Sequence, residues 1–208
     1  MTKKKIAMFG MLGDMRELVA SEALRRGHSV TAIMPDETEM KLSGPRLAIV
    51  KGEIKNKEDI SKYAKGHDVV IAFNEPTKGN PGEHLVAIRM FIDGTKEAGA
   101  HHLVAVGHAF GKWSGSGQQA FDKYKPILQA QRDALALFRN ERDLNWSYLH
   151  SPEPEIGQEN GDYRMSNDIL CTHLQGEHKI QPKNFTESLI DEAESNVMEL
   201  HEQREGEE

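Results

Sequence analysis

The stretch from Lys4 to Gly27 constrains the fold of this chain more than any other. A short apolar run at residues 6–9 leads into the glycine turn Gly10-Met11-Leu12-Gly13, and a helical pattern follows that ends at Gly27. A strand, a tight turn and a helix in this order direct backbone N–H groups and the positive end of the helix dipole at an anion above the strand. The stretch therefore predicts a first βα unit that can hold an anion.

The spacing in this turn matches two of the three glycines that a dinucleotide-binding turn uses. In the pattern Gly-x-x-Gly-x-x-Gly, the glycines keep the turn tight, let it approach the pyrophosphate and let the helix pack closely. Gly10 and Gly13 are present, but Arg16 stands at the third position. Arg16 could offer a guanidinium to phosphates, although a bulky group there favours filling of the pocket. Asp14 could be the helix N-cap, and its carboxylate would repel a phosphate.

Further along the chain, helical segments end in glycine and strands follow almost at once. The junctions lie at Gly27, Gly66 and Gly99, and each precedes an apolar run typical of a strand buried on both faces. Repeated βα units imply a parallel sheet with right-handed crossovers. The sequence predicts an α/β fold, a Rossmann-type doubly wound parallel sheet with helices on both faces. A single domain is expected over residues 1–200, with a charged, frayed tail at 201–208.

The positions of the elements follow from the same patterns. The expected strands are 4–9, 28–34, 47–51, 68–73, 102–107 and 144–149, and the expected helices are 14–26, 57–65, 82–98, 122–142 and 183–199. Asn56, followed three residues later by Asp59, predicts the start of the second helix. Pro152 and Pro154 predict a loop over the carboxyl edge of the sheet, and 162–164 and 169–173 could be short strands.

The composition narrows the class of partner. The formal net charge of −7 disfavours nucleic acid and anionic membranes, because both need basic patches on the protein. The single cysteine, Cys171, excludes an intramolecular disulfide and suits a reducing compartment. No apolar segment is long enough for a signal peptide or a membrane span. These features predict a soluble, cytoplasmic protein that acts on small molecules.

Candidate site residues follow from the expected strand ends, because ligands of open α/β sheets bind above the carboxyl edge. Asp36 could accept hydrogen bonds from the ribose of NAD, although Pro35-Asp36 is equally an ordinary turn, and nothing here favours NADP. His108 follows the fifth strand and is a candidate general acid that Glu155 could orient. A structural histidine and a solvated surface acid are the simpler alternatives. No histidine or cysteine spacing typical of a ligand set occurs, so no metal is predicted.

Several stretches carry a family resemblance, among them Lys-Lys-Ile-Ala-Met-Phe-Gly at 4–10 and Gly-His-Asp-Val-Val-Ile at 66–71. The others lie at 23–33, 52–54, 124–126, 143–148 and 161–164. Together they resemble the atypical short-chain dehydrogenases that comprise the NADH-flavin reductases and the flavin reductase/biliverdin-IXβ reductase group, the NmrA-like NAD(P)-binding proteins. The similarity covers nearly the whole chain to about residue 195.

The resemblance implies that NAD or NADP lies over the glycine turn and that a flavin or similar flat acceptor lies under the loop 151–157. Gly10, Gly13 and the backbone of Met11, Leu12, Asp14, Met15 and Arg16 would hold the pyrophosphate. Asp36 would hold the adenosine ribose, and Glu53 and Ile54 would edge the adenine. Phe73, Asn74, Gly107 and His108 would flank the nicotinamide.

The departures from the family pattern fall mainly at this crevice. Arg16 replaces the third glycine, Pro35 replaces the arginine common after the second strand of NADP-using members, and Glu53 replaces an aspartate. The favoured hypothesis is an NAD(P)H-dependent reductase of the flavin-reductase type with a degenerate dinucleotide site. The alternative is a non-catalytic ligand sensor or protein-interaction module that has lost its cofactor. Either would be a monomer or a homodimer.

Overall fold

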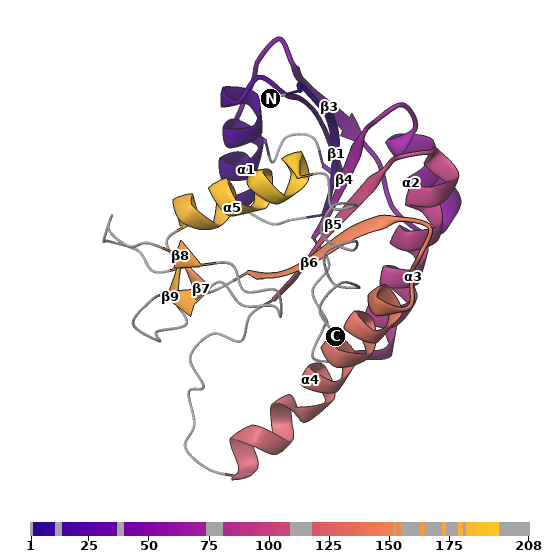
Figure 1. Cartoon of the computed structure of the whole chain (residues 1–208), viewed down its shortest axis with the longest axis vertical. Coiled ribbons are helices and arrows are strands. Elements are labelled where there is room, and N and C mark those ends of the chain that lie inside the picture. Colours follow the sequence, from indigo (N-terminus) through magenta and orange to yellow (C-terminus); the bar gives the residue numbers. More distant parts are fainter. Residues whose placement is uncertain are drawn as a thin grey trace, which may run out of the picture.

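The computed structural model describes residues 2–10, 14–36, 40–73, 81–108, 118–151, 153–154, 163–164, 172–173, 179–180 and 182–195. Its centre is a six-stranded sheet in which neighbouring strands are all parallel, in the order β3-β2-β1-β4-β5-β6 (Figure 1). The strands are β1 (Lys5–Phe9), β2 (Ser29–Met34), β3 (Leu47–Lys51), β4 (Val69–Phe73), β5 (His102–His108) and β6 (Asn145–Ser151). The predicted doubly wound parallel sheet is confirmed.

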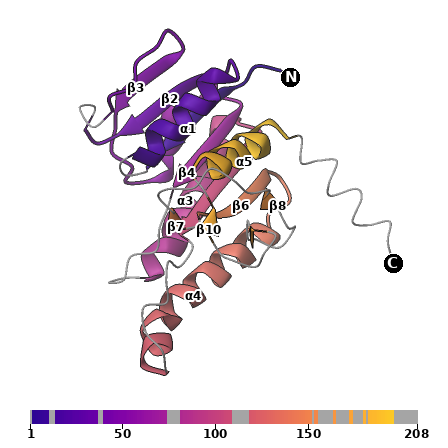
Figure 2. The same ribbon diagram turned by 90° about the vertical axis from the view of Figure 1, so that its left-hand side faces the viewer.

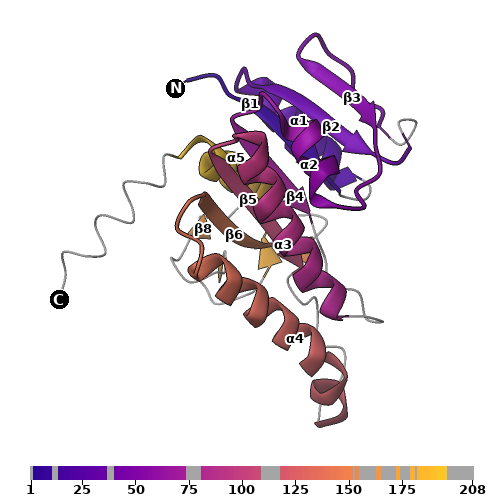
Figure 3. The ribbon, with the colours of Figure 1, turned by 90° about the vertical axis from the view of Figure 1, so that its right-hand side faces the viewer.

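Helices cover both faces of the sheet. α1 (Asp14–Arg25) and α5 (Pro182–Glu194) lie side by side on one face, as Figure 2 shows. α2 (Lys57–Ala64), α3 (Pro81–Ala98) and α4 (Gln118–Arg139) cover the other face (Figure 3). Alternate strand residues enter two separate cores, so that Met8 packs toward α1 and α5 whereas Phe9 packs toward α2 and α3. The central strands are buried on both faces, which explains their continuous apolar sequences.

Short strand pairs complete the described structure. β7 (Glu153–Pro154) pairs with β10 (Lys179–Ile180) in parallel, and β8 (Tyr163–Arg164) pairs with β9 (Thr172–His173) in antiparallel. Both short strands expected from the sequence are therefore present, each over two residues. The expected tail at 201–208 lies outside the described residues.

The observed helix ends can be compared with the helix ends that the sequence predicts. The Asn56 side chain accepts a hydrogen bond from the backbone N–H of Asp59 at 2.9 Å, as a predicted N-cap should. α4 begins four residues earlier and ends three residues earlier than predicted, with Pro126 inside it. α5 ends at Glu194 rather than at 199, and the Ser195 hydroxyl donates to the carbonyl of Glu192 at 2.7 Å. A hydroxyl that bonds back to the last turn competes with continuation of the helix.

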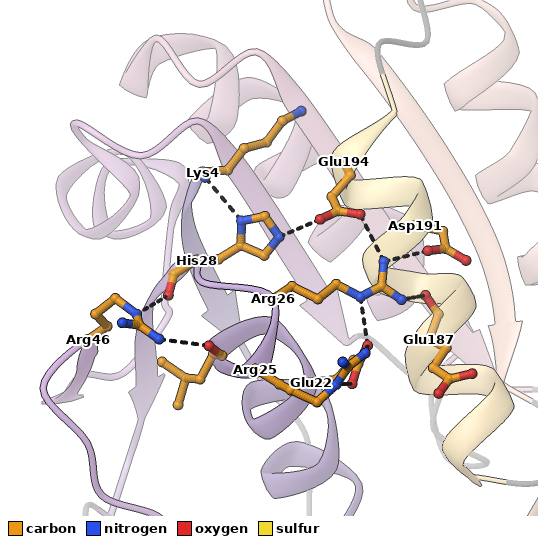
Figure 4. A network of polar contacts seen from close by, with 10 residues as sticks. Lys4, Glu22, Arg25, Arg26, His28, Arg46, Glu187, Asp191 and Glu194 are labelled. Atoms are coloured by element: carbon orange, nitrogen blue, oxygen red, sulfur yellow. Dashed lines mark hydrogen bonds and ion pairs between the residues drawn. The ribbon is translucent and has the colours of Figure 1, made fainter. Parts of the chain in front are cut away.

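An ion network joins α1 to α5 across the sheet face (Figure 4). Arg26, the residue after α1, donates to Glu22 at 2.6 Å and to Glu194 at 2.8 Å, and it also pairs with Asp191. Hydrogen bonds from Arg25 and Arg26 lower the pKa of the Glu22 carboxyl to about 2. Arg26 is only 14% exposed, so these bonds are poorly screened by water. The network anchors the last described helix to the first.

His28 extends this network to the strands. Its Nδ1 accepts a hydrogen bond from the backbone N–H of Lys4 at 3.1 Å. Because a backbone N–H only donates, the ring proton lies on Nε2, which donates to Glu194 at 2.8 Å. The buried imidazole therefore serves as a neutral link between the start of β1 and α5.

Candidate functional site

The order of the strands reverses between β1 and β4, and this reversal defines the candidate site. β1 leads through α1 to β2 on one side, whereas the strands on the other side of β1 are β4, β5 and β6. All six strands are parallel, so their carboxyl ends lie at one edge of the sheet. In open α/β sheets, ligands bind in the crevice outside this edge, at the reversal. The heads of α1 and α3 lie at the same edge, because each helix follows a strand end.

Gly10 directly follows β1, and this position requires glycine for two reasons. Its φ is +74°, in the left-handed region that residues with a Cβ rarely adopt. A Cβ at Gly10 would also lie 2.4 Å from the carbonyl oxygen of Phe73, the last residue of β4. The end of β1 is thus held closely against the end of β4 at the point of reversal. Met11, Leu12 and Gly13, the rest of the predicted turn, lie outside the described residues.

The head of α1 carries the residues that depart from the dinucleotide pattern. Asp14 is the first residue of the helix, and Met15 is half-buried against the core below. Arg16, at the position of the third glycine, is 3% exposed. Its Nη1 lies 3.6 Å from the Sδ of Met34, the last residue of β2. The side chain therefore extends across the crevice floor toward β2, inside the fold rather than out into water.

The ends of β2 and β3 carry the residues expected near the adenosine. Asp36 is exposed just beyond β2. The end of β3 is packed tightly, since a Cβ on Gly52 would lie 2.8 Å from the Tyr63 ring. Glu53 pairs with Lys55 at 2.7 Å, which lowers the pKa of the exposed Glu53 carboxyl, and Ile54 packs against the core. These residues lie at the predicted strand ends, but their contacts assign them no ligand.

The ends of β4 and β5 carry the residues expected near the nicotinamide. Phe73 is half-buried at the end of β4, and Gly107 is buried in β5 opposite His150 of β6. His108 is the last residue of β5 and pairs with Ser151, which confirms its position at the strand end. Asn74 and Glu155 lie outside the described residues, as does the side chain of His108. The catalytic roles of His108 and Glu155 remain predictions.

His84 is a buried residue at this edge that sequence reasoning did not single out. It lies in the first turn of α3 and is 2% exposed. Phe91, seven residues later, contacts Phe9 at the end of β1 with ring centroids 5.6 Å apart. Seven helical residues span about 10 Å, so His84 lies farther toward the head of α3 than the level of Phe9, on the carboxyl-edge side of the sheet. The sequence feature that could have indicated its burial is its position four residues before the core residue Ile88, on the same side of the helix.

A second polar cluster lies at the opposite, amino edge of the sheet. His102 Nε2 lies 2.9 Å from Ser147 Oγ, which donates to Glu192 Oε1 at 2.5 Å. Burial, with a smaller contribution from Lys4, lowers the pKa of His102 to about 4. The cluster joins β5, β6 and α5 at the far end of the strands from the crevice, so it supports the fold rather than the cofactor site.

The remaining surface features lie away from the strand ends. A groove of about 420 Å³ runs between α3 and α4 and contains no strand-end residue; it is lined by Lys57, Leu85, Val86, Arg89, Met90, Asp93, Asp133 and Leu137. Within the described part of the chain, no group of three or more histidine, cysteine, aspartate or glutamate side chains could hold a metal ion. No helix in that part is long and apolar enough to cross a membrane.

The parallel sheet, its reversal of strand order and the helices on both faces define an α/β protein of the Rossmann class. The chain belongs to the NAD(P)H-binding family, whose sequence model matches residues 13–193. It is 25% identical over 203 residues to the uncharacterized protein YwnB of Bacillus subtilis. The alignment covers 91% of this chain and 92% of YwnB.

Two solved structures show how widely this fold is shared. A structure from Bacteroides thetaiotaomicron, provisionally named an epimerase, is 24% identical with a TM-score of 0.76, over 94% of this chain and 93% of its own. A structure from Streptococcus pneumoniae, provisionally named an NADH-flavin reductase, is 24% identical with a TM-score of 0.67, over 92% and 93% of the two chains. At these identities the likeness establishes the fold and no activity.

Two features of the described backbone are compatible with a nicotinamide dinucleotide at this edge. The approach of Gly10 to Phe73 leaves no room for a Cβ, as a tight phosphate-binding turn requires. The N-terminus of α1 follows at once and supplies the positive end of a helix dipole. The side chains at that helix head differ from the usual pattern at Asp14 and Arg16. The described backbone on either side of residues 11–13 is thus compatible with a dinucleotide-binding turn, while the residues at the helix head differ from the usual pattern.

Proposed function

We propose that this protein is an NAD(P)H-dependent reductase of the flavin-reductase type, which passes a hydride from the nicotinamide to a flavin or similar flat acceptor. The observation that carries this proposal is the close approach of Gly10 to Phe73 where the strand order reverses. The family match over residues 13–193 supports it. The protein is proposed to act in the cytoplasm as a monomer or homodimer.

In this proposal the chain binds and orients, and the bound nicotinamide supplies the hydride. Gly10 and the N-terminal backbone of α1 would hold the pyrophosphate, while Asp36 would bind the adenosine ribose and Glu53 and Ile54 would edge the adenine. Phe73 and Gly107 would flank the nicotinamide. His108, oriented by Glu155, would hold the proton that the reduced acceptor takes up. The site is degenerate in this account, because Asp14 brings a negative charge toward the phosphates.

The second candidate function is a non-catalytic ligand sensor or protein-interaction module. The placement of Arg16 favours it, because a buried side chain occupies the position of the third glycine. A module of this kind would need the sheet and its helices only for stability. Asp14, Arg16 and Pro35 would not impair its function, because it would bind no dinucleotide. Cofactor oxidation separates the two candidates.

The test follows the absorbance of NADH or NADPH at 340 nm with FMN, FAD or riboflavin as acceptor. The reductase proposal predicts enzyme-dependent oxidation that Gly10→Ala abolishes, because the new methyl group would displace the end of β1 from β4. Gly66→Ala is the matched control, since Gly66 has a similar φ of +78° but no atom within 4 Å of its would-be Cβ. Oxidation that survives Gly10→Ala, or no oxidation with any of these acceptors, would contradict the proposal.

A further inference from the structure

The outer faces of α3 and α4 form an apolar groove that the proposed function does not use. Figure 3 shows the two helices side by side, with no other helix or strand drawn in front of them. The groove between them has a volume of about 420 Å³, and its apolar side chains are Leu85, Val86 and Met90 of α3 and Leu137 of α4. These two helices cover the sheet and still leave an apolar face on their outer side.

Val86 is the most exposed part of this face. Among the described residues, only Leu18 and Val86 are large apolar side chains that remain exposed, and Val86 is 61% exposed. Leu85, Met90 and Leu137 beside it are only partly buried against the core below. A single exposed apolar side chain is ordinary on a protein surface, but Val86 borders an apolar groove. A contiguous patch of this kind favours a docking surface.

The charges around the groove narrow the class of partner. Lys57 and Arg89 are positive and Asp93 and Asp133 are negative, so the rim is neutral overall. Lys57 is already paired with Glu97. Arg89 is exposed and makes no ion pair within the described part of the chain. A nucleic acid or an anionic membrane requires a surplus of basic residues, which this rim lacks. The rim instead suits a partner that carries both signs of charge.

A second copy of the chain carries these charges in complementary positions. In a two-fold symmetric interface the same patch faces itself, so every contact between two different residues is made twice. Arg89 lies on α3 and Asp133 lies on α4. Asp133 accepts one hydrogen bond, from Gln129 at 2.8 Å, and its carboxylate has further acceptor positions. When α3 of each copy packs against α4 of the other, two Arg89–Asp133 pairs can form.

We infer that this face is the interface of a two-fold symmetric homodimer, in which α3 of each copy packs against α4 of the other. The apolar side chains around the groove are buried in the contact, and Arg89 of each copy pairs with Asp133 of the other. The inference selects the homodimer from the two states that the sequence left open. It does not rest on the proposed function, because the groove contains no residue of a strand end.

Sedimentation equilibrium of the full chain, from micromolar to millimolar concentration, measures the association. Wild type should fit a monomer–dimer equilibrium. Val86→Glu should weaken the dimer at least about tenfold, because the new carboxylate would be buried without a partner. Leu18→Glu is the matched control, since it makes the same change at an exposed apolar residue on α1, which covers the opposite face of the sheet. The control should leave the dissociation constant within about twofold of wild type.

Exchanging the charges tests the two-fold arrangement. Arg89→Glu would place a carboxylate opposite Asp133 of the other copy, and Asp133→Lys would place an ammonium opposite Arg89. Each variant alone should therefore associate at least about tenfold more weakly than wild type. An equal mixture of the two variants should recover the dimer, because both contacts between the unlike copies then join opposite charges.

Thermal unfolding shows whether each variant is folded, and the mixture decides the outcome if Val86→Glu is not. A wild type that stays monomeric at every concentration would overturn the inference. A dimer that tolerates Val86→Glu as well as Leu18→Glu would also overturn it, since the interface would then lie elsewhere. A mixture that associates no better than its two components would exclude the pairing of Arg89 with Asp133 across a two-fold axis. None of these results bears on the oxidation of NADH or NADPH, which tests the proposed function separately.

Discussion

Acidification should destabilise this protein through His102 in a way that a single substitution can isolate. The imidazole is 3% exposed, its Nε2 bonds to Ser147, and its Nδ1 has no hydrogen-bond partner among the described residues. A proton on Nδ1 would therefore be buried without an acceptor. Burial is the main cause that lowers the pKa of His102 from 6.5 to about 4.

The size and sign of the effect follow from this pKa. The folded protein resists protonation between pH 6.5 and 4, whereas the unfolded chain accepts the proton. The contribution of neutral His102 is therefore complete above pH 6.5 and is lost as the pH falls toward 4. At about 1.36 kcal/mol for each pKa unit, the full loss is roughly 3 kcal/mol, and roughly 2.5 kcal/mol has been lost by pH 4.5.

The assay is urea unfolding at pH 7.5 and pH 4.5, with wild type compared to His102→Gln. Glutamine can still donate to Ser147 but does not titrate, so the variant should lose roughly 2.5 kcal/mol less between the two pH values. All other groups titrate in both proteins and cancel in the difference. His101→Gln is the control, because the neighbouring His101 side chain is exposed. An equal pH dependence of wild type and His102→Gln would refute the reasoning about burial.

Three further predictions concern Gly10, the ion network of Arg26 and the head of α1. Gly10→Ala should destabilise the fold by about 3 kcal/mol, against about 1 kcal/mol for Gly66→Ala, because only the first substitution adds a steric collision to the backbone strain. Urea unfolding compares the two variants, and equal losses of stability would contradict the close approach of Gly10 to β4. Arg26→Gln should lower the free energy of unfolding by about 3 kcal/mol, since it leaves part-buried carboxylates without their cation, and a loss below 1 kcal/mol would show that α5 is held by apolar packing alone. Asp14→Asn should tighten NADH and NADPH equally, by roughly twofold to fivefold, because the carboxylate acts on the shared pyrophosphate; a change in only one affinity, measured by nicotinamide fluorescence, would place Asp14 elsewhere.

The fold was predictable because its signals are local and repeated. Glycines at 27, 66 and 99 all have positive φ and end helices, as expected. The six sheet strands lie within two residues of their predicted positions. The end of α5 was less predictable, since the apolar pattern continues past the point where Ser195 bonds back to the last turn. The apolar periodicity of a helix does not register that competition.

The candidate site was predictable in position but not in the direction of its side chains. Strand ends place Gly10, Asp36 and Gly107 at one edge from sequence alone, because parallel strands share a carboxyl edge. The reach of Arg16 to Met34 depends on the distance between α1 and β2, which no sequence pattern specifies. His84 was missed for a similar reason, since burial of a polar residue on a core-facing helix side depends on its tertiary neighbours.

Binding of the reduced dinucleotide tests the central claim, that a cofactor cradle is retained although the side chains around it have changed. Thermal unfolding is measured with and without millimolar NADPH, with NADH in parallel. A ligand at a hundred times its dissociation constant stabilises the folded protein by about 2.7 kcal/mol, which raises the melting temperature by several degrees. The account predicts such a rise with at least one of the two cofactors. An unchanged melting temperature with both cofactors would contradict it.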